Sequence, residues 1–141
     1  MIPGDHNKIN AQIASQVAST ASGTPFIRCI RSLATYKGLP HRIEYINTPN
    51  SLTWINDSKS TTPECTNLTI KTIHKSYKNR KKIHLIAGGK RRSDNLNLIS
   101  LLANKNLEIY GIGESAEEIK RHIPSEFKNY MLICHNLNSA I

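Results

Sequence analysis

Three short apolar runs, separated by helix-like segments, constrain the fold of this chain more than any other feature. The runs span residues 83–87, 107–112 and 130–134, and glycines follow the first two. The intervening residues 96–103 and 115–122 carry apolar side chains at helical spacing. Because strands that alternate with helices form βαβ units, the pattern predicts an α/β fold with a mostly parallel sheet and right-handed crossovers.

The first part of the chain has a different pattern, which predicts two helices. Alanines at positions 11, 14, 18 and 21 follow a helical period, so we expect a helix over residues 7–22 that ends at Gly23. Thr24 followed by Pro25 is typical of an N-cap and a first helical residue. A second helix should therefore run to about residue 36, just before Gly38.

Beyond Gly38 the period changes to that of short strands. Residues 43–46 and 52–55 are β-prone, and the turn-forming residues 47–50 between them predict a hairpin. Thr61-Thr62-Pro63-Glu64 is typical of a helix start, and this helix should continue to about residue 77. Residues 136–141 predict the first turns of a last helix.

These patterns predict a division into residues 1–38, two helices of an incomplete domain, and residues 39–141, an α/β domain truncated at its end. Both chain ends lie at or inside predicted elements, so we expect a fragment of a longer protein. Its 141 residues and 15.8 kDa suffice for one ordinary domain and part of a second.

The chain is strongly basic, with a formal net charge of +9, which favours an anionic partner. Eight basic residues lie within residues 75–92. They form either a solvated helix end and loop or a binding surface. A nucleic-acid-binding module is the alternative function, but only Tyr77 interleaves with these charges, and no RNA-binding or zinc-finger pattern accompanies them.

Several chemistries lack their sequence signature. The three cysteines are far apart, as in a reduced cytoplasmic protein, and the histidines have no metal-ligand spacing. No G-x-S-x-G or G-x-x-x-x-G-K-[ST] motif occurs, and no complete G-x-G-x-x-G supports a stand-alone Rossmann-like binding domain. No run of 18 apolar residues occurs, so we expect no membrane span.

Three ordered segments resemble the D-glutamate-adding Mur ligases. They are G-D-H-N-K-I-N at residues 4–10, G-L-P-H-R-I-E at residues 38–44, and W-I-N-D-S-K-S-T at residues 54–61. A fourth match, L-I-A-G-G at residues 85–89, lies at the expected place. The resemblance covers almost the whole chain. It implies the last two helices of the central ATPase domain followed by a Rossmann-like C-terminal Mur ligase domain.

The resemblance implies an ATP-dependent, amide-forming ligase of peptidoglycan precursor synthesis. Its substrates would be UDP-N-acetylmuramoyl-L-alanine and D-glutamate, joined through an acyl phosphate. Catalysis of this kind neutralises the charge that develops on the transferred phosphoryl group. The family's phosphate-binding loop and Mg²⁺ ligands would lie outside this chain, so we expect the fragment alone to be an inactive monomer. An inactive remnant of such a ligase is the other reading.

The family pattern assigns ATP contacts to four residues. Asn7 and Asn10 would lie near the adenine, although either could merely cap a helix. Arg42 would reach the γ-phosphate with its fork of donors, or else form an ion pair with Glu44. Asp57 would bind the ribose, or else cap a turn.

The same pattern assigns D-glutamate contacts. Lys59 and Thr61 would hold its carboxylates, with Arg42 and Lys59 as the catalytic residues. As bare sequence features, Lys59 and Thr61 could be a surface lysine and an N-cap. The loop after Gly88-Gly89 reads K-R-R-S-D, so Arg92 and Ser93 fall where many members have Lys with Ser or Thr. Lys90 is the alternative to Arg92.

Overall fold

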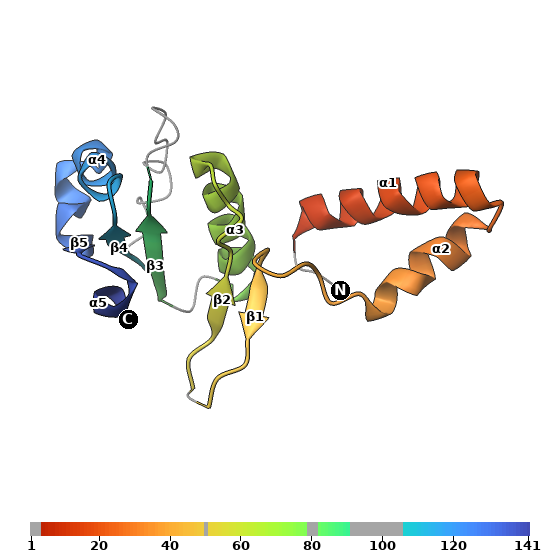
Figure 1. The fold of residues 1–141 in the computed structure, drawn as a ribbon, viewed down its shortest axis with the longest axis horizontal. Coiled ribbons are helices and arrows are strands. Elements are labelled where there is room, and N and C mark those ends of the chain that lie inside the picture. The colour runs from red at the N-terminus through yellow and green to blue at the C-terminus, as the bar shows by residue number, and fades with distance from the viewer. Residues whose placement is uncertain (1–3, 50, 79–81, 91–105) are drawn as a thin grey trace. The chain divides into compact units, whose positions relative to one another are not determined.

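The computed structural model describes residues 4–49, 51–78, 82–90 and 106–141. The chain forms two compact units, Met1–Lys59 and Ser60–Ile141 (Figure 1). The predicted helix over residues 96–103 lies outside the described residues. No helix in the described ranges is both long enough and apolar enough to cross a membrane.

Two helices open the first unit, as predicted. Helix α1 spans Asp5–Ser22 and ends at Gly23, whose left-handed φ of 68° lets its N–H reach the Ser19 carbonyl at 2.9 Å. Helix α2 spans Phe26–Ser32 and tightens into a 3₁₀ turn, η1, over Leu33–Thr35.

The predicted Thr24 cap is wrong. Pro25 occupies the N-cap of α2, and its carbonyl accepts hydrogen bonds from the N–H groups of Arg28 and Cys29. No side-chain cap hydrogen bond is present. The reason is that Pro25 has an extended ψ of 135°, so helical geometry begins one residue later than the sequence suggested.

The predicted hairpin is confirmed. Strand β1 spans Glu44–Ile46, strand β2 spans Trp54–Asn56, and they pair antiparallel with Tyr45 opposite Ile55. By backbone contacts this hairpin belongs to the first unit.

The second unit begins with α3, which spans Pro63–Ser76. Thr62 caps this helix, because its side chain accepts the Cys65 N–H and Pro63 supplies the preset first helical residue. The last turn carries the basic residues His74 and Lys75, which suit the negative end of the helix dipole.

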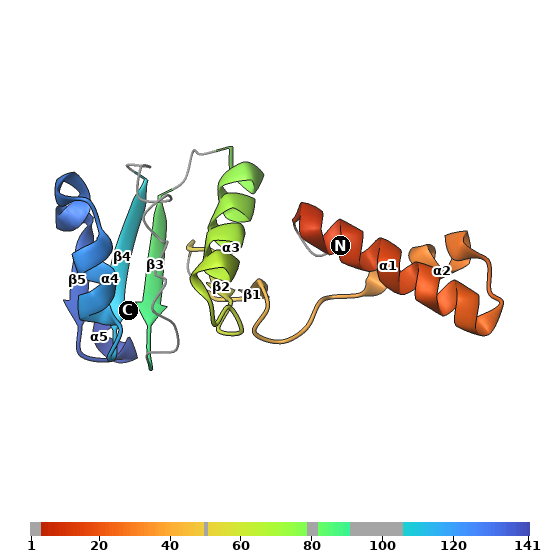
Figure 2. The same cartoon turned by 90° about the horizontal axis from the view of Figure 1, so that it is seen from above.

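A three-stranded parallel sheet follows, which confirms the predicted α/β fold for the described part. Its strands are β3 (Ile83–Gly88), β4 (Leu107–Ile112) and β5 (Met131–Cys134) in the order β3-β4-β5. Figure 2 shows the strands side by side with α3 and α4 running along the sheet. The register aligns Gly88 with Ile112, so the carboxyl ends of β3 and β4 are level.

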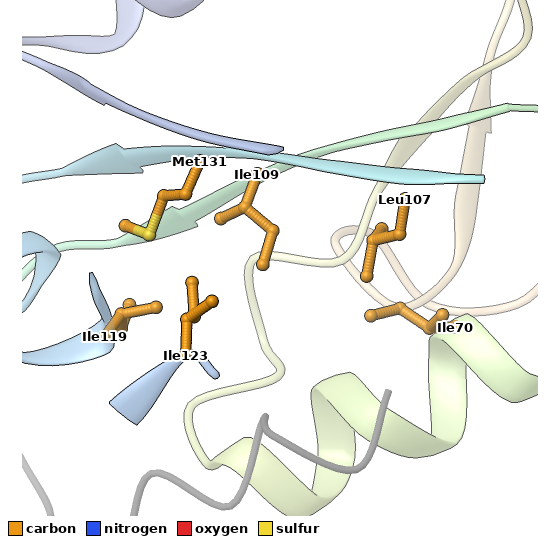
Figure 3. Packing of buried hydrophobic residues seen from close by; sticks show 6 residues of the cluster. All are labelled: Ile70, Leu107, Ile109, Ile119, Ile123 and Met131. Carbon is orange, nitrogen blue, oxygen red and sulfur yellow. The ribbon is translucent and has the colours of Figure 1, made fainter. Parts of the chain in front are cut away.

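The hydrophobic core lies on one face of this sheet. Leu107, Ile109 and Met131 point from the strands toward Ile70 of α3 and Ile119 of α4 (Figure 3). All are at most 3% exposed. At about 25 cal/mol per Å² of buried apolar area, these side chains supply the main driving force for folding this unit.

The remaining elements connect and follow β4 and β5. Helix α4 spans Ala116–His122, a 3₁₀ segment, η3, spans Ser125–Tyr130, and α5 spans Leu137–Ala140. Asn136 caps α5 in a reciprocal capping box with Ser139. The sequence predicted both α-helices but not η3, whose chain enters through Pro124 in extended geometry.

Candidate functional site

Residues 38–43 lie between the two helices and the hairpin, and we call this segment the junction. Its backbone is unusual. His41 and Ile43 adopt positive φ values of 65° and 46°. Such a conformation is strained for any residue with a side chain and is an outlier for a β-branched one. Strain of this kind persists only where neighbours hold it, and it is concentrated at functional sites.

Asp57 supplies one of the groups that hold this backbone. Its carboxylate oxygen Oδ1 accepts the N–H of Ile43 at 3.0 Å, across 14 residues of sequence. The Lys59 N–H donates to the His41 carbonyl at 3.1 Å. The loop that leaves the hairpin therefore braces the segment that enters it, and the half-buried Asp57 has a structural role beside any role in binding.

Glu44 organises the other side of this junction. Its Oε2 accepts the His41 N–H at 2.8 Å and lies 3.5 Å from the Asn56 amide nitrogen, which also lies 2.8 Å from His41 Nδ1. The expected alternative of an Arg42–Glu44 ion pair is not present in the described structure, because the Glu44 carboxylate faces His41 instead. His41 and Asn56 lie within the quoted motifs, but no sequence pattern predicted that they would contact Glu44.

Arg42 and Lys59 are both exposed. The Arg42 backbone is held by its N–H, which donates to the Leu39 carbonyl at 3.3 Å. The braced junction thus fixes where each side chain starts while leaving its cationic end in solvent. A guanidinium held in this way can meet a phosphate with two parallel hydrogen bonds.

Asn7 and Asn10 lie inside α1 rather than at its cap. Gly4 occupies the N-cap, without a side-chain cap hydrogen bond, so the reading of these asparagines as helix caps is wrong. Three residues apart on a helix, the two amides lie on one face. The expected adenine contact stays a prediction.

Thr61 is exposed and directly precedes the N-cap of α3. The alternative prediction that Thr61 is the N-cap is wrong, because Thr62 occupies that position and its side chain accepts the Cys65 N–H. The hydroxyl of Thr61 is therefore not required by the helix. Its predicted contact with an acidic substrate is untested.

The carboxyl edge of the sheet forms a second ordered cluster, in the other unit. Gly89 donates its N–H to the Ile112 carbonyl at 2.8 Å, and its own carbonyl accepts both the N–H and the Oγ–H of Ser115, each at 3.2 Å. Gly113, with a φ of 68°, packs so closely on Gly89 that a Cβ would lie 2.9 Å from the Gly89 Cα. Gly89, which directly follows β3, is thereby joined to the residues that follow β4.

Lys90 directly follows Gly89 in the sequence, and its side chain is exposed. Arg92 and Ser93 lie outside the described residues, so the choice between Lys90 and Arg92 stays open. Carboxyl edges of parallel strands are where ligands bind in α/β folds. The edge that carries Lys90 is accordingly the candidate anion-binding edge of the second unit.

The opposite, amino edge of the sheet carries an ionic network. Lys82 Nζ lies 2.6 Å from Glu108 Oε1, while Tyr110 donates its hydroxyl to Glu108 Oε2 at 3.1 Å. The hydrogen bond from Lys82 lowers the pKa of Glu108, and the same bond raises the pKa of Lys82. His84 stacks on the Tyr110 ring, with the ring centroids 5.8 Å apart.

This network bears on the nucleic-acid alternative. Lys82 and Lys90 flank a six-residue strand, which separates them by about 20 Å. Lys82 is also neutralised by Glu108. Lys82 and Lys90, two described members of the charge cluster, thus lie at opposite edges of the sheet, which disfavours a single nucleic-acid-binding surface.

A shallow concavity lies elsewhere, against Gln16, Val17, Thr20 and Ala21 of α1. No predicted site residue lines it, so we assign it no chemistry.

Comparison with known proteins identifies relatives that match most of this chain. The chain is 36% identical over 128 residues to the UDP-N-acetylmuramoylalanine–D-glutamate ligase of Buchnera aphidicola subsp. Baizongia pistaciae (strain Bp). The aligned residues cover 90% of this chain and 28% of that ligase. The chain is homologous to this family of ligases.

Other members of the ligase family match similarly. The enzyme of Escherichia coli (strain K12) is 31% identical over 119 residues, which cover 84% of this chain and 26% of the enzyme. That of Shigella dysenteriae serotype 1 (strain Sd197) is also 31% identical over 119 residues. The chain thus spans just over a quarter of the length of these relatives. No protein-family model matches it.

The ligase resemblance implies Mg²⁺, and the described residues offer few ligands for such an ion. They contain no group of three or more His, Cys, Asp or Glu side chains that could hold a metal ion. Asp57, the one carboxylate among the predicted ATP-binding residues, already accepts a backbone hydrogen bond. We therefore derive no step through Mg²⁺ from these side chains.

Proposed function

We propose that this chain is part of a cytoplasmic ligase that uses ATP to join D-glutamate to UDP-N-acetylmuramoyl-L-alanine, in peptidoglycan precursor synthesis. The observation that carries the proposal is the match of 84–90% of the chain to ligases of that name. The junction around Arg42 and Asp57 supports it. Its positive-φ residues and the hydrogen bond from Ile43 to Asp57 lie in two of the three segments that resemble the family, residues 38–44 and 54–61.

In this proposal, residues 1–38 belong to the ATP-binding domain and residues 39–141 to the C-terminal Mur ligase domain. The three-stranded parallel sheet agrees with such a domain. The boundary near residue 38 precedes the positive-φ residues His41 and Ile43. A hinge at this place would use backbone geometry that is already unusual.

The proposed chemistry rests on charge neutralisation. ATP would transfer its γ-phosphoryl group to the substrate carboxylate, and the amino group of D-glutamate would displace phosphate to form the amide. Arg42 would bind the γ-phosphate through its guanidinium fork, and Asp57 would accept hydrogen bonds from the ribose. Asn7 and Asn10 would contact the adenine.

The proposed binding of D-glutamate uses cations and hydroxyls. Lys59 would neutralise a carboxylate, with Thr61 as a hydrogen-bond donor. Arg92 with Ser93, or Lys90 in place of Arg92, would add a further cation. Mg²⁺ would be held by residues outside this chain.

A chimera tests the proposal. The 141-residue chain replaces the matching segment of the E. coli K12 ligase, and the purified chimera is assayed for phosphate release. We expect release that requires ATP, D-glutamate and UDP-N-acetylmuramoyl-L-alanine together. A chimera that folds, as judged by a cooperative thermal transition, and binds ATP but releases no phosphate would refute the proposal and favour an inactive remnant.

Substitutions at two residues of the chimera test individual roles. Arg42→Ala should lower kcat at least about a hundredfold, whereas Arg42→Lys, which keeps the charge but loses the fork, should recover only part of it. Asp57→Asn keeps an oxygen that can accept the Ile43 N–H, so any loss in this variant reflects the missing charge rather than a collapsed junction. Unchanged kinetics in Arg42→Ala or in Asp57→Asn would remove that residue from the site.

A further inference from the structure

The side chain of Ser115 forms a hydrogen bond with a distant residue instead of capping its own helix. Ser115 occupies the N-cap of α4, where a serine side chain normally accepts an N–H of its own helix. No such cap hydrogen bond is present. Instead the Oγ–H donates to the carbonyl of Gly89, 26 residues away, at 3.2 Å. Ser115 is only 9% exposed, so this hydroxyl is committed to the neighbouring loop.

The Gly89 carbonyl receives two donors from one residue. The Ser115 N–H also lies 3.2 Å from it, so both lone pairs of the oxygen are used. This oxygen belongs to the peptide unit that joins Gly89 to Lys90. Because that unit is planar, fixing its oxygen also fixes the nitrogen of Lys90 and the direction in which the chain continues.

Gly89 needs such a restraint more than its neighbours do. Its φ is 110°, and a Cβ built on it would meet nothing within 4 Å, so no packing limits it on that side. Gly88, in contrast, is the last residue of β3 paired with β4, and a Cβ built on it would collide with the Ile112 carbonyl oxygen. Glycine has the largest backbone freedom of any residue, and the two Ser115 hydrogen bonds restrict that freedom where Lys90 begins.

We propose that Ser115 is a positioning residue: it fixes the Gly89–Lys90 peptide so that the Lys90 cation meets a carboxylate of the acidic substrate. The substrate part of this inference rests on the proposed ligase function. A cation that binds a carboxylate remote from the reacting amine contributes equally to ground state and transition state. Its misplacement therefore raises KM without lowering kcat.

The first experiment measures backbone order in the full 141-residue chain by ¹⁵N relaxation. Ser115→Ala should lower the order parameter of Lys90 while that of Ile112, which lies within the sheet ladder, stays unchanged. Ser115→Thr, which keeps a hydroxyl, should restore it. Unchanged order at Lys90 in Ser115→Ala would overturn the inference.

The second experiment uses the ligase chimera. Ser115→Ala should raise KM for D-glutamate about three- to tenfold, the effect of losing one neutral hydrogen bond, with kcat and KM for ATP unchanged. In a chimera that carries Lys90→Gln, the same substitution should have no further effect. Ser125→Ala, an exposed serine of the same unit, is the matched control and should change nothing.

The outcomes separate the two claims. Equal changes in all kinetic parameters, or additive effects of Ser115→Ala and Lys90→Gln, would mean that Ser115 merely stabilises the fold, and would leave the ligase proposal intact. A folded wild-type chimera without activity would overturn the ligase proposal, and with it the substrate assigned to Lys90.

Discussion

Different interactions stabilise each of the two units of this chain. In the second unit, buried apolar side chains of the sheet meet those of α3 and α4. In the first, Ile43 is the sole buried hydrophobic residue among those described, while Ile9, Ile13 and Val17 of α1 are more than half exposed. The first unit relies on backbone hydrogen bonds and on polar contacts around Asp57 and Glu44.

The difference teaches where stability and chemistry reside. A packed core loses several kcal/mol when one side chain is truncated, whereas polar contacts of half-exposed groups contribute about 1 kcal/mol each. The second unit should therefore tolerate changes of exposed side chains at its edges, such as that of Lys90. The first unit should be sensitive to losses of single hydrogen bonds at its junction.

The largest contrast is expected from the same substitution in each unit. Ile109→Ala, at a residue only 1% exposed, should lower the free energy of unfolding by about 2–5 kcal/mol. Ile13→Ala, at a residue 58% exposed, should change it by less than about 0.5 kcal/mol. Urea denaturation followed by circular dichroism measures both. Equal losses would show that α1 is buried in solution.

A pair of glycines with the same φ of 68° gives the next largest contrast. Gly113→Ala must displace Gly89, so its cost should exceed the roughly 1–2 kcal/mol of placing an alanine in left-handed geometry. Gly23→Ala meets no atom within 4 Å and should cost only that backbone term. Thermal unfolding of the two variants tests the ordering, which fails if Gly23→Ala is the more destabilising.

The junction of the first unit can be tested locally. Asp57→Ala removes the acceptor for the Ile43 N–H, and should speed hydrogen exchange of that amide about tenfold, which corresponds to a loss of about 1.4 kcal/mol. Asp57→Asn retains an oxygen acceptor and should have a smaller effect. Equal protection in both variants and the wild type would mean that Asp57 does not brace the junction.

The smallest expected effect is the pH dependence of the ionic network in the second unit. Lys82 lowers the pKa of Glu108 in the folded state, so the unfolded state binds a proton more readily than the folded one. The network therefore stabilises the fold above the ordinary glutamate pKa of about 4.5, and this contribution is lost as pH falls through the lowered value. Glu108→Gln should flatten the dependence of the unfolding midpoint on pH in this acidic range.

Much of the local structure was predictable, because its causes are local. Glycine at position 23 allows a left-handed helix end, and Thr62-Pro63 supplies a cap and a preset first residue for α3. The alternation of strands and helices predicted the parallel sheet. The Thr24 cap failed because the extended ψ of Pro25 delayed the helix by one residue.

The candidate site was only partly predictable. Motif resemblance located Arg42, Asp57 and Lys59, but it gave no sign that Asp57 braces the Ile43 backbone. Nor did it single out Ser115, although a serine just before a predicted helix could have drawn attention as a cap. The Asp57–Ile43 contact joins residues 14 positions apart, and the Ser115–Gly89 contact joins residues 26 positions apart. No local rule predicts such partners.

The sequence by itself determined the order and type of most elements, the kinship with the ligases, and one face of β4, whose L-E-I-Y pattern alternates. Strand β5 reads M-L-I-C, which is apolar throughout and cannot choose a face by pattern. Only the tertiary structure decided that Met131 is buried and Leu132 exposed. The reason is physical: a period of two needs polar residues to break its symmetry, and without them the packing of α3 and α4 on one side makes the choice.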